Sequence, residues 1–413
     1  MKVKGRAMHR FLILGAGPSG LTVANTLLDR GVDDFIVLEK EDEAGGLCRS
    51  EEVDGSPLDT GGGHFLDVRR PSVNEFLFRF LPESEWDIYE RDSRIRVNGQ
   101  MVSHPLEANI WQMDIDTQIE YLMSISKAGC VTGKPMPSSF VEWIRWKLGD
   151  KISDDYMIPY NTKMFGDELN ELGTYWLNKL PDVSFEDTLR SCLEHRAYAK
   201  QPGHARFYYP KKYGYGELWK RMAARLEDRI IYNASASVID FDDHLVETVD
   251  GRIFEGQTII TTVPWPGFKA LRGMPSSVFE RIKDLKYTGV VISYCGDTLD
   301  SKAHWIYEPS PDKDYHRLLL RHNFCPGSKG YWKETRIGRF RDEEGMILFT
   351  NEYAYPLNTR NKPEIMDELI KWSESRGVYA VGRWGEHEHY NSDAVVERSI
   401  QLAERLIGFT EKI

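Results

Sequence analysis

The sequence lacks the features of a disulfide-bonded, membrane-spanning or nucleic-acid-binding protein. Its five cysteines are widely scattered, without CxxC spacing or histidines placed for zinc, so we expect a reducing compartment and no metal site. No apolar run approaches the ~20 residues that a membrane span needs. The net charge of −11 argues against nucleic-acid binding, which depends on clustered cations. The first ten residues show no export signal. We therefore expect a soluble cytoplasmic protein.

A glycine-rich turn stands between two predicted elements near the N-terminus. Residues 11–14 form an apolar run that predicts a strand, Gly15-Ala16-Gly17-Pro18-Ser19-Gly20 follows, and apolar residues at helical spacing come next. In this G-x-G-x-x-G pattern the glycines permit the tight turn, the approach of a pyrophosphate and close helix packing. Glu39 ends the next predicted strand and can accept hydrogen bonds from a ribose. The predicted dinucleotide-binding residues here are Gly15, Gly17, Pro18, Ser19, Gly20, Glu39 and Lys40.

The segments that follow this predicted strand indicate which dinucleotide binds. Gly45-Gly46-Leu47-Cys48-Arg49 comes first, and Leu58-Asp59-Thr60-Gly61-Gly62-Gly63-His64 comes second. This succession resembles the FAD-binding start of the flavoprotein family that includes amine oxidases, phytoene desaturases and UDP-galactopyranose mutases. The resemblance implies that the first segment lies along the FAD pyrophosphate and ribityl chain, and that the second passes beside the isoalloxazine ring. We expect FAD contacts from Gly46, Leu47, Arg49, Gly63 and His64.

A second turn that suits an anion lies near the C-terminus. Gly382-Arg383-Trp384-Gly385 leads through Tyr390-Asn391-Ser392 into an apolar helix. A helix start offers free N–H groups, and an arginine adds a bidentate charge for a pyrophosphate or the flavin O2 edge. We therefore predict cofactor contacts from Arg383, Asn391 and Ser392, and we also assign Val238, in a β-rich segment, to the cofactor site.

The changing periodicity of the chain predicts more than one domain, because 413 residues exceed the size of one ordinary core. The spacing of apolar residues is helical from about 72 to 200, strand-like at 206–263 and 285–352, and helical again near 363–376 and 394–407. We expect an α/β protein with a discontinuous Rossmann-like FAD-binding domain (1–70, 205–265 and 345–413), a mainly helical insertion (71–204) and an antiparallel β-sheet substrate domain (266–344).

Several motifs resemble one branch of this family in particular. His104-Pro105-Leu106-Glu107-Ala108-Asn109-Ile110, Pro159-Tyr160-Asn161-Thr162-Lys163 and Trp305-Ile306-Tyr307-Glu308-Pro309 are similar, in order, to segments of UDP-galactopyranose mutases, especially the eukaryotic type. The resemblance implies a nucleotide-sugar substrate and a reduced FAD that attacks the anomeric carbon, so that pyranose and furanose forms interconvert. It also allows NAD(P)H as an external reductant. A homo-oligomer is compatible with the sequence.

The same resemblance assigns roles to individual residues. Arg317 corresponds to a diphosphate-binding arginine, and His64 to the residue that presses on the flavin, so these two are the predicted catalytic residues. Elsewhere the chain departs from the family: Tyr208 replaces an arginine, with Arg206 two residues earlier, and Phe324 replaces a tyrosine after Asn323. The resemblance therefore specifies the family and not the sugar. The predicted substrate-binding residues are Asn161, Trp176, Arg206, Tyr208, Tyr307, Arg317, Asn323 and His389.

Two other functions remain open from the sequence. An FAD-dependent oxidoreductase related to amine oxidases or desaturases would need an apolar or amine-binding cage against the flavin, whereas the corresponding segments here are polar and rich in tyrosine. A flavin-binding protein without catalysis would keep the glycine loops and lose its substrate groups, and the altered phosphate-binding positions are in keeping with that.

Overall fold

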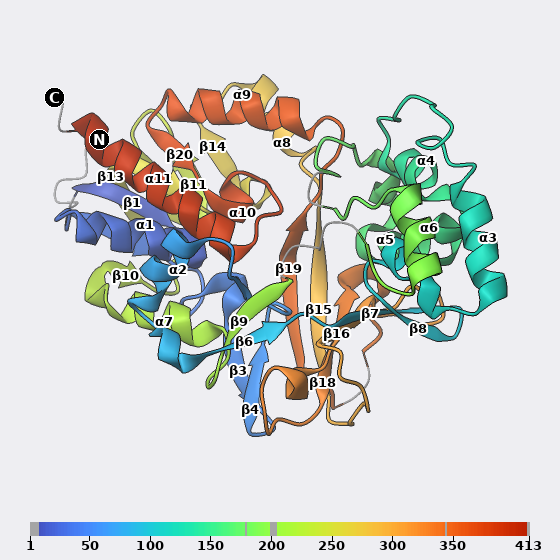
Figure 1. Cartoon of the computed structure of the whole chain (residues 1–413). Helices are drawn as coiled ribbons and strands as arrows, with labels where there is room; N and C mark the ends of the chain where they lie inside the picture. Colours follow the sequence, from blue (N-terminus) through green and yellow to red (C-terminus); the bar gives the residue numbers. More distant parts are fainter. Residues whose placement is uncertain (1–7, 178–179, 199–204, 343–344, 411–413) are drawn as a thin grey trace.

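In the computed structural model, residues 8–177, 180–198, 205–342 and 345–410 are described. The expected domains begin, meet or end at residues 1–7, 199–204 and 411–413, and these residues lie outside the described ranges. Figure 1 shows a layered α/β region at the left, a large sheet in the middle and a cluster of helices at the right. The expected α/β class is confirmed. None of the described helices is long and apolar enough to cross a membrane.

The α/β region is built on an eight-stranded sheet with a parallel core. The apolar strands β1 and β2 lie inside it, and their side chains alternate between two cores: Phe11 and Ile13 pack on one face, Leu12 and Leu14 on the other. Strands covered on both faces are expected to be apolar throughout. The parallel strands are β10 (Ile230–Ile231), β2 (Phe35–Leu38), β1 (Met8–Leu14), β13 (Ile253–Thr261) and β20 (Val378–Ala380).

The sheet branches at strand β13, which pairs with two different strands along one of its edges. Its first residues pair with an antiparallel strand and its last residues pair with β20. The branch contains β12 (Leu245–Thr248), β11 (Ala236–Asp240) and β14 (Ala270–Arg272). Helices pack around this sheet: α1 (Pro18–Asp29), α2 (Pro71–Phe78), α7 (Gly216–Ala224), α8 (Ser276–Ile282), α9 (Lys362–Glu374), α10 (Gly382–Gly385) and α11 (Ser392–Thr410). Of these, α1 and α11 pack directly on each other.

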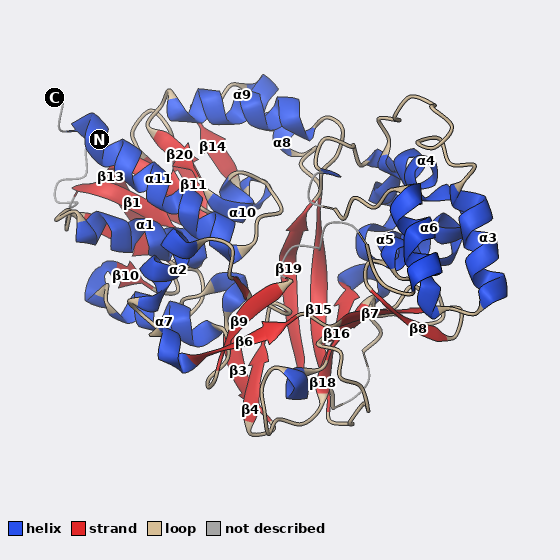
Figure 2. Cartoon of the chain, in the orientation of Figure 1, coloured by secondary structure: helices blue, strands red, loops and turns tan. Residues whose placement is uncertain are grey.

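A seven-stranded sheet forms the middle of the molecule (Figure 2). All neighbouring strands in it are antiparallel except β7 and β16, which are parallel. In spatial order the strands are β19 (Leu348–Pro356), β15 (Tyr287–Cys295), β18 (Tyr331–Arg336), β17 (Arg317–Leu319), β16 (Trp305–Tyr307), β7 (Ser93–Val97) and β8 (Gln100–Ser103). Two small sheets join it to the α/β region: β5 (Leu66–Asp67), β9 (Arg206–Pro210) and β6 (Trp86–Glu90), and the hairpin β3 (Ser50–Val53) and β4 (Ser56–Asp59).

The helical cluster has its own apolar core, which includes Tyr121, Phe140 and Ile144. Its helices are α3 (Ile115–Ile125), α4 (Phe140–Ile152), α5 (Ile158–Phe165) and α6 (Phe185–Glu194), and a π-helical turn (Ser153–Met157) joins α4 to α5.

Three segments pack with a different part of the molecule from the domain to which the sequence analysis assigned them. Strands β6 to β8, from the expected helical insertion, pair with the sheets, and β14 and α8 join the α/β region. Strand β19 completes the seven-stranded sheet, although residues 345–413 were expected to belong to the cofactor domain. Strands take hydrogen-bond partners that are distant in sequence, and the local periodicity of one chain does not specify those partners.

Candidate active site

The glycine turn forms a tight connection between β1 and α1. The Gly15 N–H donates to the Leu38 carbonyl at 2.8 Å, and the Ala16 N–H donates to the Glu39 carboxylate at 2.7 Å. A Cβ atom on Gly20 would lie 1.9 Å from the Gly15 carbonyl oxygen, so helix and turn can approach only because Gly20 has no side chain. Helix α1 begins after Gly17 without a side-chain cap. Its first turn therefore suits an anion.

Segments that are far apart in the sequence meet at the start of α1. A Cβ atom on Gly46 would lie 3.3 Å from the Gly17 α-carbon, and one on Gly382 would lie 1.8 Å from the Ser19 hydroxyl oxygen. The Tyr215 hydroxyl is 2.6 Å from that of Ser392, at the start of α11. The structure thus brings together the predicted segments around residues 15–20, 46–49, 382–385 and 392.

Two arginines make this site suitable for the pyrophosphate or the polar edge of a flavin. The Arg49 Nε atom is buried and has no acceptor among the described residues. Arg383 donates to the backbone carbonyls of Tyr390 and Ala354, each at 3.0 Å, and no carboxylate pairs with it in the described part of the chain. Burial lowers the pKa of Arg383. A half-buried guanidinium without a carboxylate partner favours an anionic or carbonyl partner, so the residues present fit FAD.

The segment Gly61-Gly62-Gly63-His64 connects this site with the seven-stranded sheet. A Cβ atom on Gly63 would lie 2.0 Å from a Leu319 methyl group, so the loop lies directly on β17. His64 Nδ1 is 2.8 Å from the Gly62 carbonyl oxygen, and the His64 ring stacks on Tyr215 at 6.2 Å. Burial, with the charge of Arg383, lowers the pKa of His64 to about 4. The imidazole is neutral at pH 7, with Nδ1–H donating to Gly62 and Nε2 left as an acceptor.

Arg317, whose side chain is 21% exposed, forms an ion pair with the buried Glu334 on the adjacent strand. Arg317 Nε and its NH2 group lie 2.7 and 2.5 Å from Glu334 Oε2. The other carboxylate oxygen, Oε1, accepts the Gly63 N–H at 3.1 Å. Burial opposes ionisation of this fully buried glutamate, but the Arg317 charge and His316 outweigh it and hold the pKa of Glu334 at about 2. One carboxylate therefore positions both Arg317 and the loop beside His64.

Tyrosines surround the Arg317 guanidinium. Tyr307 is the register partner of Arg317 across β16 and β17, and the Tyr160 ring lies 5.3 Å from that of Tyr307. Arg317 NH2 is 3.4 Å from the Tyr355 hydroxyl, and the Tyr355 ring is 5.1 Å from His389. Burial raises the pKa values of Tyr160 and Tyr355, so both hydroxyls remain protonated donors. Predicted residues Tyr307, Arg317 and His389 thus belong to one polar cluster.

Two predicted substrate residues on β9 point away from this cluster. The Tyr208 hydroxyl donates to Glu83 at 3.1 Å, and Arg206 pairs with Glu90 at 2.8 Å near the surface. The reason is the two-residue period of a strand: the neighbouring Phe207 is fully buried, which turns both polar side chains outward.

Three further predicted residues use their polar groups for local structure. Asn161 donates to the Met157 carbonyl, at the end of the π-helical turn that precedes α5, and Trp176 donates to the Gly173 carbonyl and packs on Phe140. The Asn323 amide donates to the backbone carbonyls of residues 301 and 303.

The remaining predicted cofactor residues take different positions. Lys40 is exposed and pairs with Glu41, and Val238 is buried in β11. Leu47 belongs to the turn between Gly45 and Arg49, and Asn391 directly precedes α11.

The predicted site residues leave out several members of the cluster, namely Glu334, Arg91, Tyr160 and Tyr355, although Tyr160 stands in a motif that carries the resemblance. Arg91 NH2 donates to the Tyr307 hydroxyl at 3.2 Å, and its guanidinium stacks on the Trp305 ring at 4.9 Å. The sequence offered one signal for Glu334: a single carboxylate stands inside an otherwise strand-like run with two large aromatic residues, Tyr331 and Trp332.

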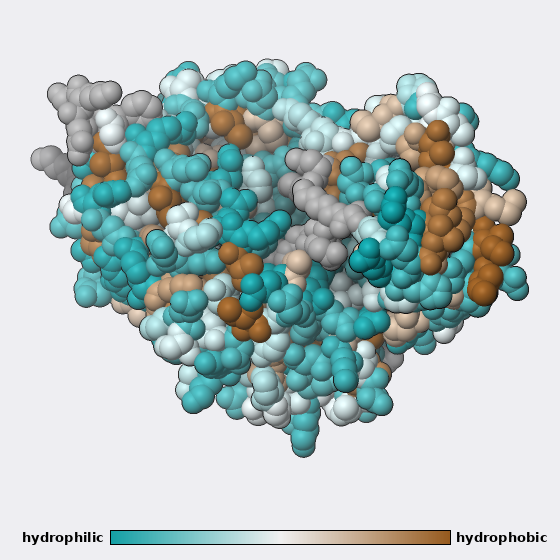
Figure 3. Space-filling model, in the orientation of Figure 1, coloured by the Kyte–Doolittle hydropathy of each residue, from teal (hydrophilic) through white to brown (hydrophobic). Residues whose placement is uncertain are grey.

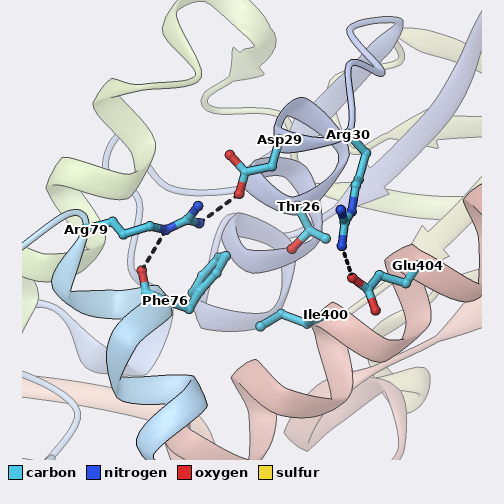
Figure 4. Close-up of a pocket in the computed structure, with 7 residues that line it drawn as sticks. All are labelled: Thr26, Asp29, Arg30, Phe76, Arg79, Ile400 and Glu404. Atoms are coloured by element: carbon cyan, nitrogen blue, oxygen red, sulfur yellow. Dashed lines mark hydrogen bonds and ion pairs between the residues drawn. The ribbon is translucent and has the colours of Figure 1, made fainter.

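A surface cavity of about 410 Å³ lies at the other end of α1 (Figure 4). Ion pairs between Arg79 and Asp29, and between Arg30 and Glu404, cross its lining. It is remote from the glycine turn, because Thr26, Asp29 and Arg30 lie at the end of α1 and not at its start. This cavity is not part of the candidate active site.

Comparison with solved structures supports the fold. A reduced UDP-galactopyranose mutase superposes with a TM-score of 0.86 at 20% identity, covering 97% of this chain and 96% of the other. A fatty acid isomerase from P. acnes gives 0.67 at 16% identity (96% and 98% covered), and a putrescine oxidase gives 0.61 at 14% (98% and 100% covered).

Curated relatives match shorter stretches. Coproporphyrinogen III oxidase of Mycobacterium tuberculosis is 33% identical over 98 residues, which is 23% of this chain and 21% of that protein. An "uncharacterized protein in nifH2 3'region" of Methanothermococcus thermolithotrophicus is 48% identical over 52 residues, 13% of this chain and 49% of the relative. The matches thus span about a fifth to a half of these relatives. The sequence of this chain also matches a protein-family model, described as flavin containing amine oxidoreductase, over residues 18–296. With the FAD-compatible glycine turn, this match shows that the chain belongs to the flavin-containing amine oxidoreductase family.

Proposed function

We propose that this chain is an FAD-dependent mutase that interconverts the pyranose and furanose forms of a nucleotide sugar. One observation carries the proposal: Arg317, a cation suited to a diphosphate, shares the buried Glu334 with Gly63, in the loop expected beside the flavin ring. The likeness to UDP-galactopyranose mutase, which extends over nearly the whole chain, supports it. A leaving diphosphate and the cofactor ring would then lie on opposite sides of one carboxylate.

The start of α1, Arg49 and Arg383 would hold the cofactor, with His64 against the ring. When bound and reduced, FAD supplies the nucleophile for the anomeric carbon. Arg317 would then bind the diphosphate and stabilise the charge that develops as it leaves. The neutral His64 would present Nε2 as a hydrogen-bond acceptor without adding charge.

The tyrosine hydroxyls complete the proposed substrate pocket. Tyr307 and Tyr355 lie next to Arg317 and would donate hydrogen bonds to phosphate or sugar oxygens. Because Glu334 already neutralises Arg317, this pocket has a smaller positive charge than one with an isolated arginine. We propose that hydroxyl donors therefore supply much of the affinity for the diphosphate.

A second candidate function is an FAD-dependent oxidoreductase, which the family and the likeness to a putrescine oxidase favour. The polar residues around Arg317 argue against an apolar substrate. Net electron transfer would distinguish this function, because a mutase returns its cofactor to the reduced state without consuming a reductant stoichiometrically.

The test is to titrate dithionite-reduced protein with UDP-, GDP-, CDP- and dTDP-sugars and to separate each mixture for an isomeric product. We expect one nucleotide sugar to raise the melting temperature and to yield an isomer of equal mass, and we expect the oxidised protein to be inactive until dithionite or NAD(P)H reduces it. Equal activity of the oxidised protein would refute the mutase proposal. Rapid flavin reduction by an amine or an apolar compound, with no isomer, would establish the oxidoreductase.

Arg317→Ala tests the anion site directly. We expect it to weaken nucleotide binding by about 2–5 kcal/mol, because it removes the cation that pairs with the buried Glu334. Arg272→Ala is the matched control, since Arg272 is exposed and pairs with Glu247 on the branch of the first sheet. Unchanged nucleotide affinity in Arg317→Ala would remove this residue from the site.

A further inference from the structure

His316 is a buried histidine that directly precedes Arg317 in the chain. Hydrophilic side chains cover most of the face shown in Figure 3, where water can solvate them, whereas the His316 side chain is only 1% exposed. Neither of its ring nitrogens has a hydrogen-bond partner among the described residues. Buried polar groups are nearly always hydrogen-bonded, so an unpartnered buried imidazole is a candidate for a functional group.

The imidazole lies beside the carboxylate that also binds Arg317. His316 Nε2 is 3.6 Å from Glu334 Oε2, the same oxygen that the Arg317 NH2 group contacts at 2.5 Å. The longer of these distances exceeds that of a hydrogen bond, but protonation of Nε2 would shorten it, because a charge-assisted bond to a carboxylate spans about 2.7–2.9 Å. One carboxylate oxygen thus lies between a permanent cation and a base that can become a cation.

Ionisable groups face His316 from each element packed against it. Strand β18 contributes Glu334. Helix α5 contributes Tyr160, whose ring lies 6.1 Å from the imidazole, and Lys163, whose Nζ donates to the backbone carbonyl of the residue before His316. The turn after β16 contributes Glu308, whose N–H donates to the His316 carbonyl and whose carboxylate pairs with an arginine of β7.

These surroundings keep His316 neutral in the free protein. Burial lowers the pKa of His316 below 6.5, the Glu334 carboxylate opposes this effect, and the positive charges of Arg317 and Lys163 add to the lowering. At pH 7 the imidazole therefore carries no charge. Arg317 and Glu334 neutralise each other, so this part of the pocket has no surplus positive charge for an anion.

A bound diphosphate changes this balance. Its negative charge beside Arg317 favours the protonated form of a nearby base. A protonated His316 would pair with Glu334 in place of Arg317, and the Arg317 guanidinium could then direct its donors to the diphosphate.

We propose that His316 is a positioning residue that takes up one proton when a diphosphate binds and thereby releases Arg317 from Glu334. The proton comes from the solvent, is held at Nε2 and returns to the solvent when the diphosphate leaves. This inference rests on the proposed function, because it takes a nucleotide diphosphate as the ligand of Arg317. It explains how an arginine that already has a carboxylate partner can bind an anion.

The test is isothermal titration calorimetry of the flavin-loaded, oxidised chain with the same UDP-, GDP-, CDP- and dTDP-sugars, in buffers that differ in ionisation enthalpy. Both phosphates of a nucleotide sugar are esterified, so the ligand itself takes up no proton near neutral pH. For the nucleotide sugar that binds, we expect uptake of up to about one proton at pH 7. By linkage, its affinity should fall by up to about tenfold for each unit by which the pH rises.

His316→Asn and His316→Gln keep a polar side chain that cannot be protonated. We expect both variants to bind without proton uptake and with an affinity that is constant between about pH 6 and 8. They should bind more weakly than wild type at the lower pH and equally well once wild-type His316 stays neutral, whereas a purely structural role would weaken binding equally at every pH. His195→Asn is the matched control: His195 is exposed at the end of α6, so proton uptake should be unchanged.

The outcomes separate this inference from the proposed function. A wild-type chain that binds a nucleotide sugar without proton uptake would overturn the role of His316 and leave the mutase proposal standing. Uptake that persists in both His316 variants would do the same, because another group would then accept the proton. If none of the four nucleotide sugars binds, the mutase proposal fails and this inference fails with it. Circular dichroism and flavin absorbance establish that the variants are folded.

Discussion

Replacing Glu334 with glutamine tests the buried ion pair that positions Arg317 and the loop beside His64. The substitution keeps the shape of the side chain and removes its charge, so the Arg317 guanidinium is left without its anion. The pKa of Glu334 is lowered from 4.5 to about 2. This difference corresponds to about 3 kcal/mol, because a tenfold change in a dissociation constant is about 1.4 kcal/mol. We expect Glu334→Gln to lower the free energy of unfolding by about that amount at pH 7.

The pH dependence gives this prediction a second, independent signature. Because the pKa of Glu334 is lower in the folded state, its contribution to stability is fully present above the unfolded-state value of 4.5 and is lost as the pH falls toward 2. The difference between wild type and Glu334→Gln, measured by urea unfolding, should therefore be constant above about pH 5 and shrink below it. Titrating groups that do not interact with Glu334 cancel in this difference.

Glu280→Gln is the control for this experiment. Glu280 also pairs with a cation, Lys283 at 2.6 Å, but both side chains are 63% exposed, so the cost should be below about 1 kcal/mol. If Glu334→Gln costs no more than Glu280→Gln, or if its effect is the same at pH 3 and pH 7, the description of Glu334 as a buried, charged and paired group is wrong.

Three further predictions concern the cofactor site and its surroundings. Gly382→Ala should abolish flavin retention, because the new Cβ atom would lie 1.8 Å from the Ser19 hydroxyl oxygen in α1. Gly327→Ala is the control: Gly327 has the same φ of +84° but open space around it, so this variant should only lower the melting temperature. Arg383→Ala should weaken FAD binding by about 1.5–3 kcal/mol in a flavin-fluorescence titration, and unchanged affinity would exclude a direct contact. Burial lowers the pKa values of His304 and His387 from 6.5 to about 4. Because the unfolded chain binds these protons at a higher pH than the folded chain, the free energy of unfolding should be retained above pH 6.5 and fall between pH 6.5 and 4. A melting temperature that stays constant over that range would contradict the burial of these two histidines.

The part of the candidate site that a local pattern can predict is the part encoded by neighbouring residues. Strand, glycine turn and helix follow one another directly between Phe11 and Asp29, so the pattern contains the whole geometry. The approach of Gly46 and Gly382 to the same helix could be expected only from the resemblance to known flavoproteins, since no local pattern joins positions so far apart.

Two predicted substrate residues, Arg206 and Tyr208, lie outside the polar cluster around Arg317 because of the strand face that they occupy. In Arg206–Pro210, aromatic residues occupy both faces, so the two-residue period did not reveal that Phe207 takes the core side and turns Arg206 and Tyr208 outward. Glu334 was missed because a carboxylate in a strand usually faces solvent. Its burial depends on Arg317, which only the pairing of β17 with β18 brings to it.

The branching of the first sheet at β13 has a consequence for biosynthesis. Strand β1 leaves the ribosome before its partner β13, which is about 240 residues later, and the contact of Gly382 with Ser19 forms later still. During translation β1 and α1 therefore keep apolar surfaces uncovered until β13 and then the segment around Gly382 have been made. Nascent chains that end before Gly382 would expose an incomplete flavin fold, and the complete cofactor site can form only after Gly382 has been synthesised.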